Sequence, residues 1–298
     1  MNSYIKSPLN YIGGKYKLLP QIIPLFPEQI NTFVDLFTGG CNVAVNAQAS
    51  NFICNDNLVY IIELYQTFLN NTNEYIIEYI DYQIKKYDLS QTNQAGFLEL
   101  RNRYNSHRKN PLDLFVLIAY SFNHQIRFNN SHEFNNPFGL LRSSFNNAMR
   151  QNLLRFLDRL RVLKIGFVSN DFTDFNFSGL TKNDFVYCDP PYLITTGTYN
   201  DGKRGFSGWN EKSDNDLYSI LDYLNNMGVK FALSNVLYHK GKKNDNLDCW
   251  LRNSNYIINE LRMNYSNSNY HTKNRDANSS MEVLITNYEP RNYQPQLF

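Results

Sequence analysis

The sequence of 298 residues is poor in the features of disulfide-stapled, metal-binding and membrane-spanning proteins. Its four cysteines are widely scattered, form no CxxC pair and stand near no histidine cluster at metal-ligand spacing. No apolar run approaches the roughly 20 residues of a membrane span, and no signal-peptide core follows the first residues. We therefore expect no metal, no membrane partner, a cytoplasmic location and reduced thiols at Cys41, Cys54, Cys188 and Cys249.

The sequence also lacks the signatures of several enzyme classes. A nicotinamide dehydrogenase needs GxGxxG after its first strand, whereas residues 38–43 read TGGCNV. No serine stands in the GxSxG pattern of a hydrolase, and Gly13-Gly14-Lys15 is too short for a phosphate-binding P-loop. Dehydrogenase and hydrolase chemistry are thus remote.

The net charge of +2 hides an uneven distribution of charge along the chain. Residues 101–164 hold eleven Lys and Arg against three Asp and Glu, so this stretch carries 11 − 3 = +8. A basic block in an otherwise acidic chain of enzyme size is typical of a surface for a polyanion, although a solvated helical face has the same composition.

Short apolar strands alternate with turns at both ends of the chain. Residues 32–37 predict a strand that ends at Gly39-Gly40, followed by a helix on which Val43, Ala44 and Ala47 share a face. A second strand, 51–54, ends at Asn55-Asp56, which places an acid where open α/β sheets bind ligands. Further strands are predicted at 165–169, 185–189, 229–234 and 281–286, with helices at 146–163 and 213–227.

This alternation stops for about a hundred residues in the middle of the chain. Residues 59–86 and 95–123 have helical periodicity, and 124–147 has the Asn, Ser, Pro and Gly content of loops and hairpins. We predict an α/β catalytic, cofactor-binding domain made of residues 1–58 and 161–298. An inserted, mostly helical target-recognition domain spans 59–160, with a hairpin loop at about 124–140.

The sequence Asp189-Pro190-Pro191-Tyr192 follows an apolar strand and has a specific chemical use. Two successive prolines fix the backbone and remove two donors, so the carbonyls there can accept hydrogen bonds. An exocyclic amine of a nucleobase is a poor nucleophile, and two acceptors for its protons raise the electron density on nitrogen. We expect the Asp189 carboxylate and the Pro190 carbonyl to be these acceptors and Tyr192 to stack on the base.

These four residues resemble motif IV of the amino-group DNA methyltransferases. Leu9–Lys15 is similar to the GGK signature of the Dam-like, D12-class α group, and the whole order of motifs fits that group. The resemblance implies a Rossmann-like sheet that binds S-adenosylmethionine and transfers its methyl group to N6 of an adenine flipped out of double-stranded DNA. It covers nearly the whole chain.

The resemblance also implies which residues bind the cofactor. Asp35–Gly40 is similar to the loop around the methionine moiety, Asp56 to the ribose-binding acid, and Asp171-Phe172 to an element that contacts the adenine, with Asn170 in place of the usual Gly or Ala. Physically, Gly39-Gly40 allows close backbone approach, and a carboxylate can accept hydrogen bonds from a ribose diol. The expected cofactor residues are Tyr11, Gly13, Gly14, Lys15, Asp35, Phe37, Gly39, Gly40, Asp56, Asp171, Phe172 and Asp189; the expected catalytic residues are Asp189, Pro190, Pro191 and Tyr192.

The predicted hairpin resembles the recognition hairpin of Dam-like enzymes that act at GATC. Arg127 stands where the family reads a guanine, and arginine can donate two hydrogen bonds to guanine O6 and N7; contact with phosphate alone is the alternative. The expected DNA-binding residues are Phe122, Asn123, Arg127, Asn129, Asn135 and Pro137. Tyr238–Lys243 and Tyr265–Ser268 resemble a restriction-system branch whose targets vary, so GATC stays open.

The resemblance further implies a monomer and, in a restriction-modification system, an endonuclease acting at the same site. N4-cytosine methylation poses the same chemical problem and remains an alternative, as does a non-catalytic DNA-binding module on the same scaffold. The loop 193–209 is a candidate lid over the base or an ordinary surface loop.

Overall fold

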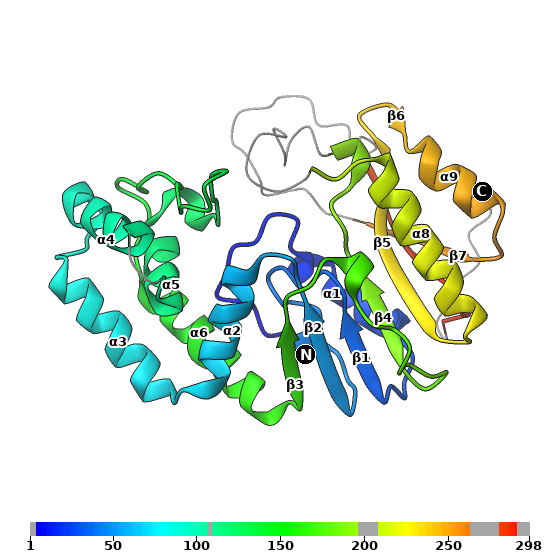
Figure 1. Ribbon diagram of the computed structural model, residues 1–298, viewed down its shortest axis with the longest axis horizontal. Helices are drawn as coiled ribbons and strands as arrows, with labels where there is room; N and C mark the ends of the chain where they lie inside the picture. The colour runs from blue at the N-terminus through cyan, green and yellow to red at the C-terminus, as the bar shows by residue number, and fades with distance from the viewer. Residues whose placement is uncertain (1–3, 107–108, 196–207, 263–279, 291–298) are drawn as a thin grey trace.

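The computed structural model describes residues 4–106, 109–195, 208–262 and 280–290 (Figure 1). Two regions named above, most of the candidate lid and Tyr265–Ser268, lie outside these residues. No helix among the described residues is long and apolar enough to cross a membrane. The four cysteines are free thiols, and three of them are buried.

The centre of the fold is a mixed, mostly parallel sheet with the strand order β3-β2-β1-β4-β5-β8-β7. The pairs among β1 to β5 are parallel, whereas β8 is antiparallel to both β5 and β7. The strands are β1 (Thr32–Asp35), β2 (Asn51–Asn55), β3 (Ile165–Val168), β4 (Phe185–Cys188), β5 (Lys230–His239), β7 (Ile257–Leu261) and β8 (Ser280–Thr286), with the short β6 (Lys242–Lys243) paired to β5.

The order of the strands reverses between β1 and β4. From β1 the chain builds the sheet outward through β2 to β3, and it then returns to place β4 on the other side of β1. The carboxyl ends of β1 and β4 therefore open into a crevice, which is where α/β sheets of this kind bind ligands. This confirms the predicted α/β fold class.

In the described part of the chain, five α-helices, with a hairpin segment between the last two, separate β2 from β3 and lie beside the sheet (Figure 1). Their bounds are α2 (Val59–Asn70), α3 (Asn73–Lys86), α4 (Gln94–Ser106), α5 (Pro111–Tyr120) and α6 (Asn147–Val162). Thr72 and Asn110 mark the starts of α3 and α5, because each side chain accepts a hydrogen bond from a first-turn backbone N–H. The two broad helical regions expected from the sequence are thus each split by a capped break.

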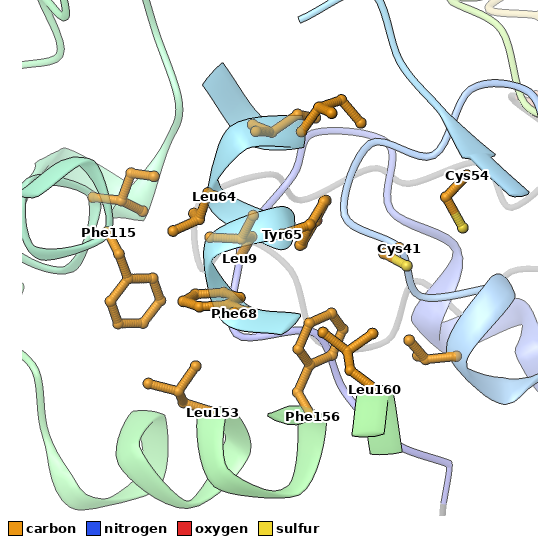
Figure 2. Close-up of a cluster of buried hydrophobic side chains, with 14 of the residues drawn as sticks. Leu9, Cys41, Cys54, Leu64, Tyr65, Phe68, Phe115, Leu153, Phe156 and Leu160 are labelled. Atoms are coloured by element: carbon orange, nitrogen blue, oxygen red, sulfur yellow. The ribbon is translucent and has the colours of Figure 1, made fainter. Parts of the chain in front are cut away.

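One hydrophobic core joins these helices to the sheet. Tyr65 on α2 stacks on Phe167 of β3 at 4.9 Å between ring centroids, and it also contacts Phe156 of α6 at 5.9 Å. Figure 2 shows α2 between α5 and α6, with its apolar side chains pointing at both. The opposite face of the sheet packs on α8 (Glu211–Asn226) and α9 (Asp245–Arg252) in a second cluster.

The prediction of a helix after Gly39-Gly40 is wrong. Only a short 3-10 turn, Ala44–Asn46, forms there. Cys41 has a left-handed backbone (φ 56°), and the side chain of Asn46 exchanges two hydrogen bonds with the backbone of Ile5. These contacts hold the N-terminal segment, and the chain leaves the turn at Ala47 in an extended conformation. The sequence analysis also did not predict β7 and α9.

Candidate active site

The predicted cofactor and catalytic residues line one pocket of about 400 Å³ at the carboxyl ends of β1, β2 and β4. The structure thus brings together segments that lie far apart in the sequence. The predicted residues found in its lining are Tyr11, Gly13, Gly14, Lys15, Asp35, Phe37, Gly39, Gly40, Asp56, Asp171, Phe172, Asp189, Pro190, Pro191 and Tyr192.

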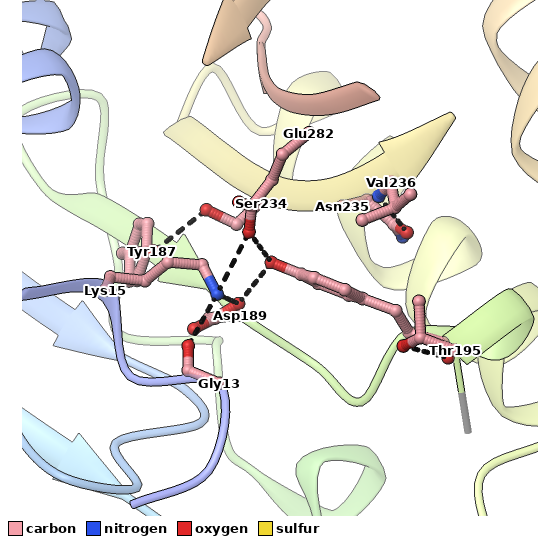
Figure 3. A network of polar contacts seen from close by, with 10 residues as sticks. Gly13, Lys15, Tyr187, Asp189, Thr195, Ser234, Asn235, Val236 and Glu282 are labelled. Carbon is pink, nitrogen blue, oxygen red and sulfur yellow. Dashed lines mark hydrogen bonds and ion pairs between the residues drawn. The ribbon is translucent and has the colours of Figure 1, made fainter. Parts of the chain in front are cut away.

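Asp189 lies in a buried polar network directly after β4 (Figure 3). Its Oδ1 is 2.9 Å from Lys15 Nζ and also accepts a hydrogen bond of 2.9 Å from the Tyr192 hydroxyl. Lys15 Nζ donates to the Gly13 carbonyl at 2.8 Å and lies 4.9 Å from the centre of the Tyr192 ring. No hydrogen bond or ion pair within the described ranges uses Asp189 Oδ2, so this oxygen can accept from a group in the pocket.

Glu282 on β8 completes this network, although the sequence analysis missed it. Its Oε1 lies 3.4 Å from Lys15 Nζ and accepts a 3.0 Å hydrogen bond from the Tyr192 hydroxyl. The strand that carries Glu282 pairs with β5, two strands from the predicted catalytic loop. No motif surrounds Glu282 in the sequence, so only the fold reveals its place.

Burial and charge act against each other on these groups. Burial raises the pKa of Asp189, and the Lys15 ammonium partly offsets that effect. Burial by itself lowers the pKa of Lys15, but the Asp189 and Glu282 carboxylates outweigh it and leave that pKa above its usual value. Burial, then Asp189 and Glu282, raise the pKa of Tyr192. Lys15 therefore stays a cation and Tyr192 a neutral hydroxyl near neutral pH.

The Gly39-Gly40 loop is held close to Tyr11. Gly39 has φ +46°, and a Cβ added there would come within 2.9 Å of the Tyr11 ring. The Tyr65 hydroxyl donates to the Gly39 carbonyl at 2.7 Å, and the Gly39 N–H donates to Asp56 Oδ2 at 2.8 Å. A larger residue at this position would push the loop and the ring apart, which explains why glycine is needed.

Asp56 is 7% exposed and binds the pocket backbone through both oxygens. Oδ1 accepts from the Leu58 N–H at 2.9 Å, in addition to the bond between Oδ2 and Gly39. Burial raises the pKa of Asp56 to about 6, although these two backbone hydrogen bonds favour the ionised form. Each carboxylate oxygen has a second lone pair that can face the pocket.

Asp35, at the end of β1, is an unusual buried acid. It is 2% exposed, and its Oδ1 is buried without a hydrogen-bond partner among the described residues. Burial and then the Asp189 and Asp56 carboxylates raise its pKa well above the usual value. A buried acceptor that lines a pocket and lacks a donor is the natural partner of a cationic or N–H group of a ligand.

Three aromatic rings form an apolar wall of the pocket. The ring of Phe172 lies 5.4 Å from that of Phe37 and 5.3 Å from that of Trp209. Trp209 also donates its indole N–H to Asp214 at 2.6 Å, which fixes the ring. Trp209 ends the candidate lid 193–209, but the sequence analysis assigned it no individual role in the site.

A family model decides the class of the protein. The model described as D12 class N6 adenine-specific DNA methyltransferase matches residues 11–275. The chain belongs to this family. Its match includes the GGK segment, the Gly39-Gly40 loop and the Asp189–Tyr192 motif, which the structure places around one pocket.

Curated relatives agree with this assignment. The chain is 53% identical over 290 residues to the modification methylase StsI of Streptococcus sanguinis, covering 97% of the chain and 44% of that protein. It is 53% identical over 287 residues to the type II methyltransferase M.FokI of Planomicrobium okeanokoites, covering 96% and 43%. A DNA adenine methylase of Salmonella typhi is 29% identical over 64% of the chain and 66% of its own length. The chain thus spans less than half the length of the first two relatives.

The hairpin of this D12-class chain stands beside the pocket. Bridges pair Phe128 with Phe134 and Ser121 with Phe138, and Tyr60 of α2 stacks on Phe128 at 4.4 Å. Arg127 also lines the pocket, and its Nε is buried without a hydrogen-bond partner among the described residues. Arg127 thus lines the pocket with a buried Nε–H that is left without an acceptor in the described part of the chain.

The other predicted DNA-binding residues do not line the pocket. Phe122 is 41% exposed under the Arg142 guanidinium, and Asn123 has a left-handed backbone whose carbonyl accepts a 2.8 Å hydrogen bond from Asn10. Asn129 uses its side chain within the hairpin turn, where Oδ1 accepts from two backbone N–H groups. Asn135 is half-buried and Pro137 is exposed.

Proposed function

We propose that this chain transfers a methyl group from S-adenosylmethionine to N6 of an adenine turned out of duplex DNA. The observation that carries the proposal is the set of contacts made by the Asp189 carboxylate. Its carboxylate lies in the pocket, with Oδ1 engaged by Lys15 and Tyr192. Such an arrangement fixes one oxygen in the protein and directs the other toward a substrate amine.

The residues of the pocket fit S-adenosylmethionine. The buried Oδ1 of Asp35, which has no hydrogen-bond partner in the described part of the chain, matches the ammonium of the methionine part. Gly39 has no side chain and packs against the Tyr11 ring, and its backbone lines the pocket, where it allows the methionine part to approach closely. The second lone pairs of the Asp56 carboxylate suit the ribose hydroxyls, and the Phe37 and Phe172 rings suit the adenine.

When bound, the cofactor supplies a methyl group that its sulfonium already activates, so the protein forms no covalent intermediate. The task of the chain is to hold the amine in line with that methyl group. Positioning of this kind supplies roughly 7–11 kcal/mol of a bimolecular barrier when the reacting groups are well aligned.

The residues after β4 orient the amine. Asp189 Oδ2 and the Pro190 carbonyl accept its two hydrogens, which increases the electron density on nitrogen. Tyr192 stacks on the base, with its hydroxyl held by Asp189 and Glu282 so that the ring has little freedom to rotate. After transfer, the surplus proton leaves the methylated nitrogen.

We assign recognition of DNA to the inserted region, residues 59–160. Arg127 reads a guanine next to the target base, because its guanidinium stands at the pocket with a buried N–H that has no partner in the described chain. GATC is one candidate site. The relatives named modification methylases make a restriction-modification role the natural setting, with an endonuclease acting at the same sequence.

A second candidate is methylation of N4 of cytosine, since that amine presents the same two hydrogens to the same acceptors. The family model is described as adenine-specific, which favours adenine. Arg127 and the basic insertion favour DNA over RNA, because a major groove wide enough for side chains is absent from A-form RNA.

Mass spectrometry of nucleosides tests the proposal. Plasmid DNA of varied sequence is incubated with the purified chain and S-adenosylmethionine and then digested. N6-methyladenine is the expected product. Detection of N4-methylcytosine would support the proposed chemistry of the pocket but would show that the target base is cytosine. If no modified nucleoside is found although the cofactor is shown to bind, DNA methylation by this chain is overturned.

A further inference from the structure

Glu282 reaches the site from a different part of the fold than the predicted catalytic residues. It stands on β8 between Met281 and Val283, which both pack in the second hydrophobic cluster, and its side chain is 12% exposed. A carboxylate this buried is costly unless it is paired. Its pairing with Lys15 and Tyr192 indicates why the fold keeps an acid at this point of a sheet.

We propose that Glu282 is a positioning residue of the methyl-transfer site, which orients Tyr192 and keeps Lys15 in place and charged beside Asp189. This inference rests on the proposed function, and it adds a residue that belongs to no recognised motif. Glu282 acts through Lys15 and Tyr192 and does not itself touch the reacting amine.

The hydrogen-bond count supports this role. A lysine ammonium has three donors, and Lys15 Nζ has three acceptors around it: the Gly13 carbonyl, Asp189 Oδ1 and Glu282 Oε1. Without Glu282, one buried donor would lose its partner. Lys15 would then be less firmly fixed. Its contact with Asp189 Oδ1, which keeps that oxygen from the substrate, would also weaken.

Tyr192 gives a second, independent reason. Its hydroxyl lies 2.9 Å from Asp189 Oδ1 and 3.0 Å from Glu282 Oε1, but it has a single hydrogen to donate. Sharing this hydrogen between two carboxylate oxygens holds the ring from both sides. With Asp189 as its only partner, the Tyr192 hydroxyl would be restrained by one hydrogen bond. The orientation of the Tyr192 ring against the base would then no longer be fixed.

The charges give the third reason. Lys15 is 4% exposed, and burial pulls its pKa down, so its charge depends on the two carboxylates. The groups that face this cation are the Asp189 carboxylate and the neutral Tyr192 ring after β4 and the Glu282 carboxylate on β8, and the two carboxylates raise its pKa. Removing Glu282 takes away one of its two direct counterions.

Two substitutions separate orientation from charge. Glu282→Ala removes both, whereas Glu282→Gln keeps an oxygen that accepts from Tyr192 and removes only the charge. Glu260→Gln on the neighbouring strand β7 is the matched control, since no contact with Lys15 is found for Glu260 among the described residues. Circular dichroism and the melting temperature establish that each variant is folded.

The first measurement is the titration of Lys15 in the full chain without cofactor or DNA. Lysine carrying ¹³C at Cε gives one NMR signal per residue, and Lys15→Arg identifies the signal of Lys15. We expect a lower Lys15 pKa in both Glu282 variants and an unchanged one in Glu260→Gln. An unchanged Lys15 pKa in folded Glu282→Ala would overturn the charge part of the proposal.

The second measurement is kcat and KM between about pH 6 and pH 10, a range that the titration of Lys15 enters only when its pKa falls below that of an ordinary lysine, about 10.4. Glu282→Ala should lower kcat by about tenfold to a hundredfold, the cost of a reacting group misplaced by about 1 Å, with little change in the KM for DNA. Glu282→Gln should recover most of kcat near pH 6. The alkaline limb of its pH–kcat profile should stay shifted to lower pH.

Wild-type kcat in folded Glu282→Ala, with an active wild-type enzyme, would overturn the orienting role. Inactive wild-type protein would instead contradict the proposed function, and the Lys15 titration would still decide whether Glu282 sets the charge of this cation. The two failures are therefore distinguishable.

Discussion

Lys15 Nζ and Asp189 Oδ1 lie 2.9 Å apart in a buried ion pair that joins the N-terminal GGK segment to the loop after β4. The side chain of Lys15 is 4% exposed and that of Asp189 is 18% exposed, so water screens the pair little. The pair ties two motifs that are distant in the sequence to one side of the pocket.

Replacing Lys15 with methionine should destabilise the protein, because a side chain of similar length then leaves two buried carboxylates without their cation. We expect the free energy of unfolding to fall by about 3 kcal/mol, measured by urea denaturation at neutral pH. Lys212→Met removes an exposed pair with Asp216 and should leave the unfolding midpoint nearly unchanged. Equal stability of Lys15→Met and wild type would contradict the energetic role of the pair.

Gly39→Ala tests the close approach of the loop. At φ +46°, an alanine costs about 1–2 kcal/mol, and its Cβ would meet the Tyr11 ring at 2.9 Å. We expect lower thermal stability and weaker binding of S-adenosylmethionine in isothermal titration calorimetry. Gly179→Ala is the control, since nothing lies within 4 Å of its Cβ and its φ is not positive. Cofactor affinity equal to that of wild type in Gly39→Ala would show that the loop does not border the ligand.

The pH dependence of cofactor binding tests Asp56. Burial raises its pKa from 3.8 to about 6, so the carboxylate is ionised above that pH and protonated below it. The ionised form accepts hydrogen bonds from ribose hydroxyls, so the Kd for S-adenosylmethionine should rise as the pH falls through about 6. Asp56→Asn should remove this part of the dependence, and identical pH profiles for the two proteins would argue against a ribose contact.

The titration of Asp56 also affects the stability of the protein. Rising pH should strengthen cofactor binding but lower the contribution of Asp56 to the free energy of unfolding. Because the folded pKa of Asp56 lies above the unfolded one, the folded state binds this proton more tightly between about pH 4 and pH 6. The contribution of Asp56 to stability therefore falls as the pH rises through this window. The free energy of unfolding of Asp56→Asn should lack this part of the pH dependence, because an amide binds no proton in this window.

Arg127→Ala should relax the choice of target sequence more than it weakens binding to DNA. A bidentate contact with guanine discriminates by about 1–3 kcal/mol, whereas phosphate contacts act on all sequences alike. Sequencing that maps N6-methyladenine across a plasmid library measures the profile. Arg155→Ala, an exposed arginine on α6, should leave the profile unaltered. An unaltered profile for Arg127→Ala would assign this residue to phosphate or to the hairpin.

The local chemistry of the site was predictable from the sequence because its parts are short segments with characteristic residues. The Asp189–Tyr192 motif ends an apolar strand, and Gly39-Gly40 follows another, so strand periodicity alone placed both at one edge of a sheet. Parallel strands bring such edges together, and the predicted cofactor and catalytic residues line one pocket.

What the sequence could not predict depends on contacts between distant segments. Glu282 is one acid in an apolar strand, and only the pairing of β8 with β5 brings it to Lys15. The turn after Gly40 has helical spacing, but the contacts of Asn46 with the N-terminal segment favour a short 3-10 turn. Tertiary hydrogen bonds here outweigh local propensity.

The charge that the insertion can offer to DNA could also not be predicted from composition alone. Several of its arginines are used inside the protein: Arg150 pairs with Asp81, Arg159 donates to the Val45 carbonyl, and Arg161 donates to Asn73. The sum of +8 therefore overstates the charge that this region can offer to phosphates. Side-chain partners of this kind cannot be read from composition.

The most direct test of the account is Asp189→Ala, assayed for methyl transfer and for cofactor binding in the same preparation. In the proposed function Asp189 orients the amine, while Gly39, Asp35 and Asp56 line the part of the pocket assigned to the cofactor. The account predicts that N6-methyladenine disappears from treated DNA while the Kd for S-adenosylmethionine stays close to that of wild type. A variant that keeps most of its methyl-transfer activity would contradict the assignment of Asp189.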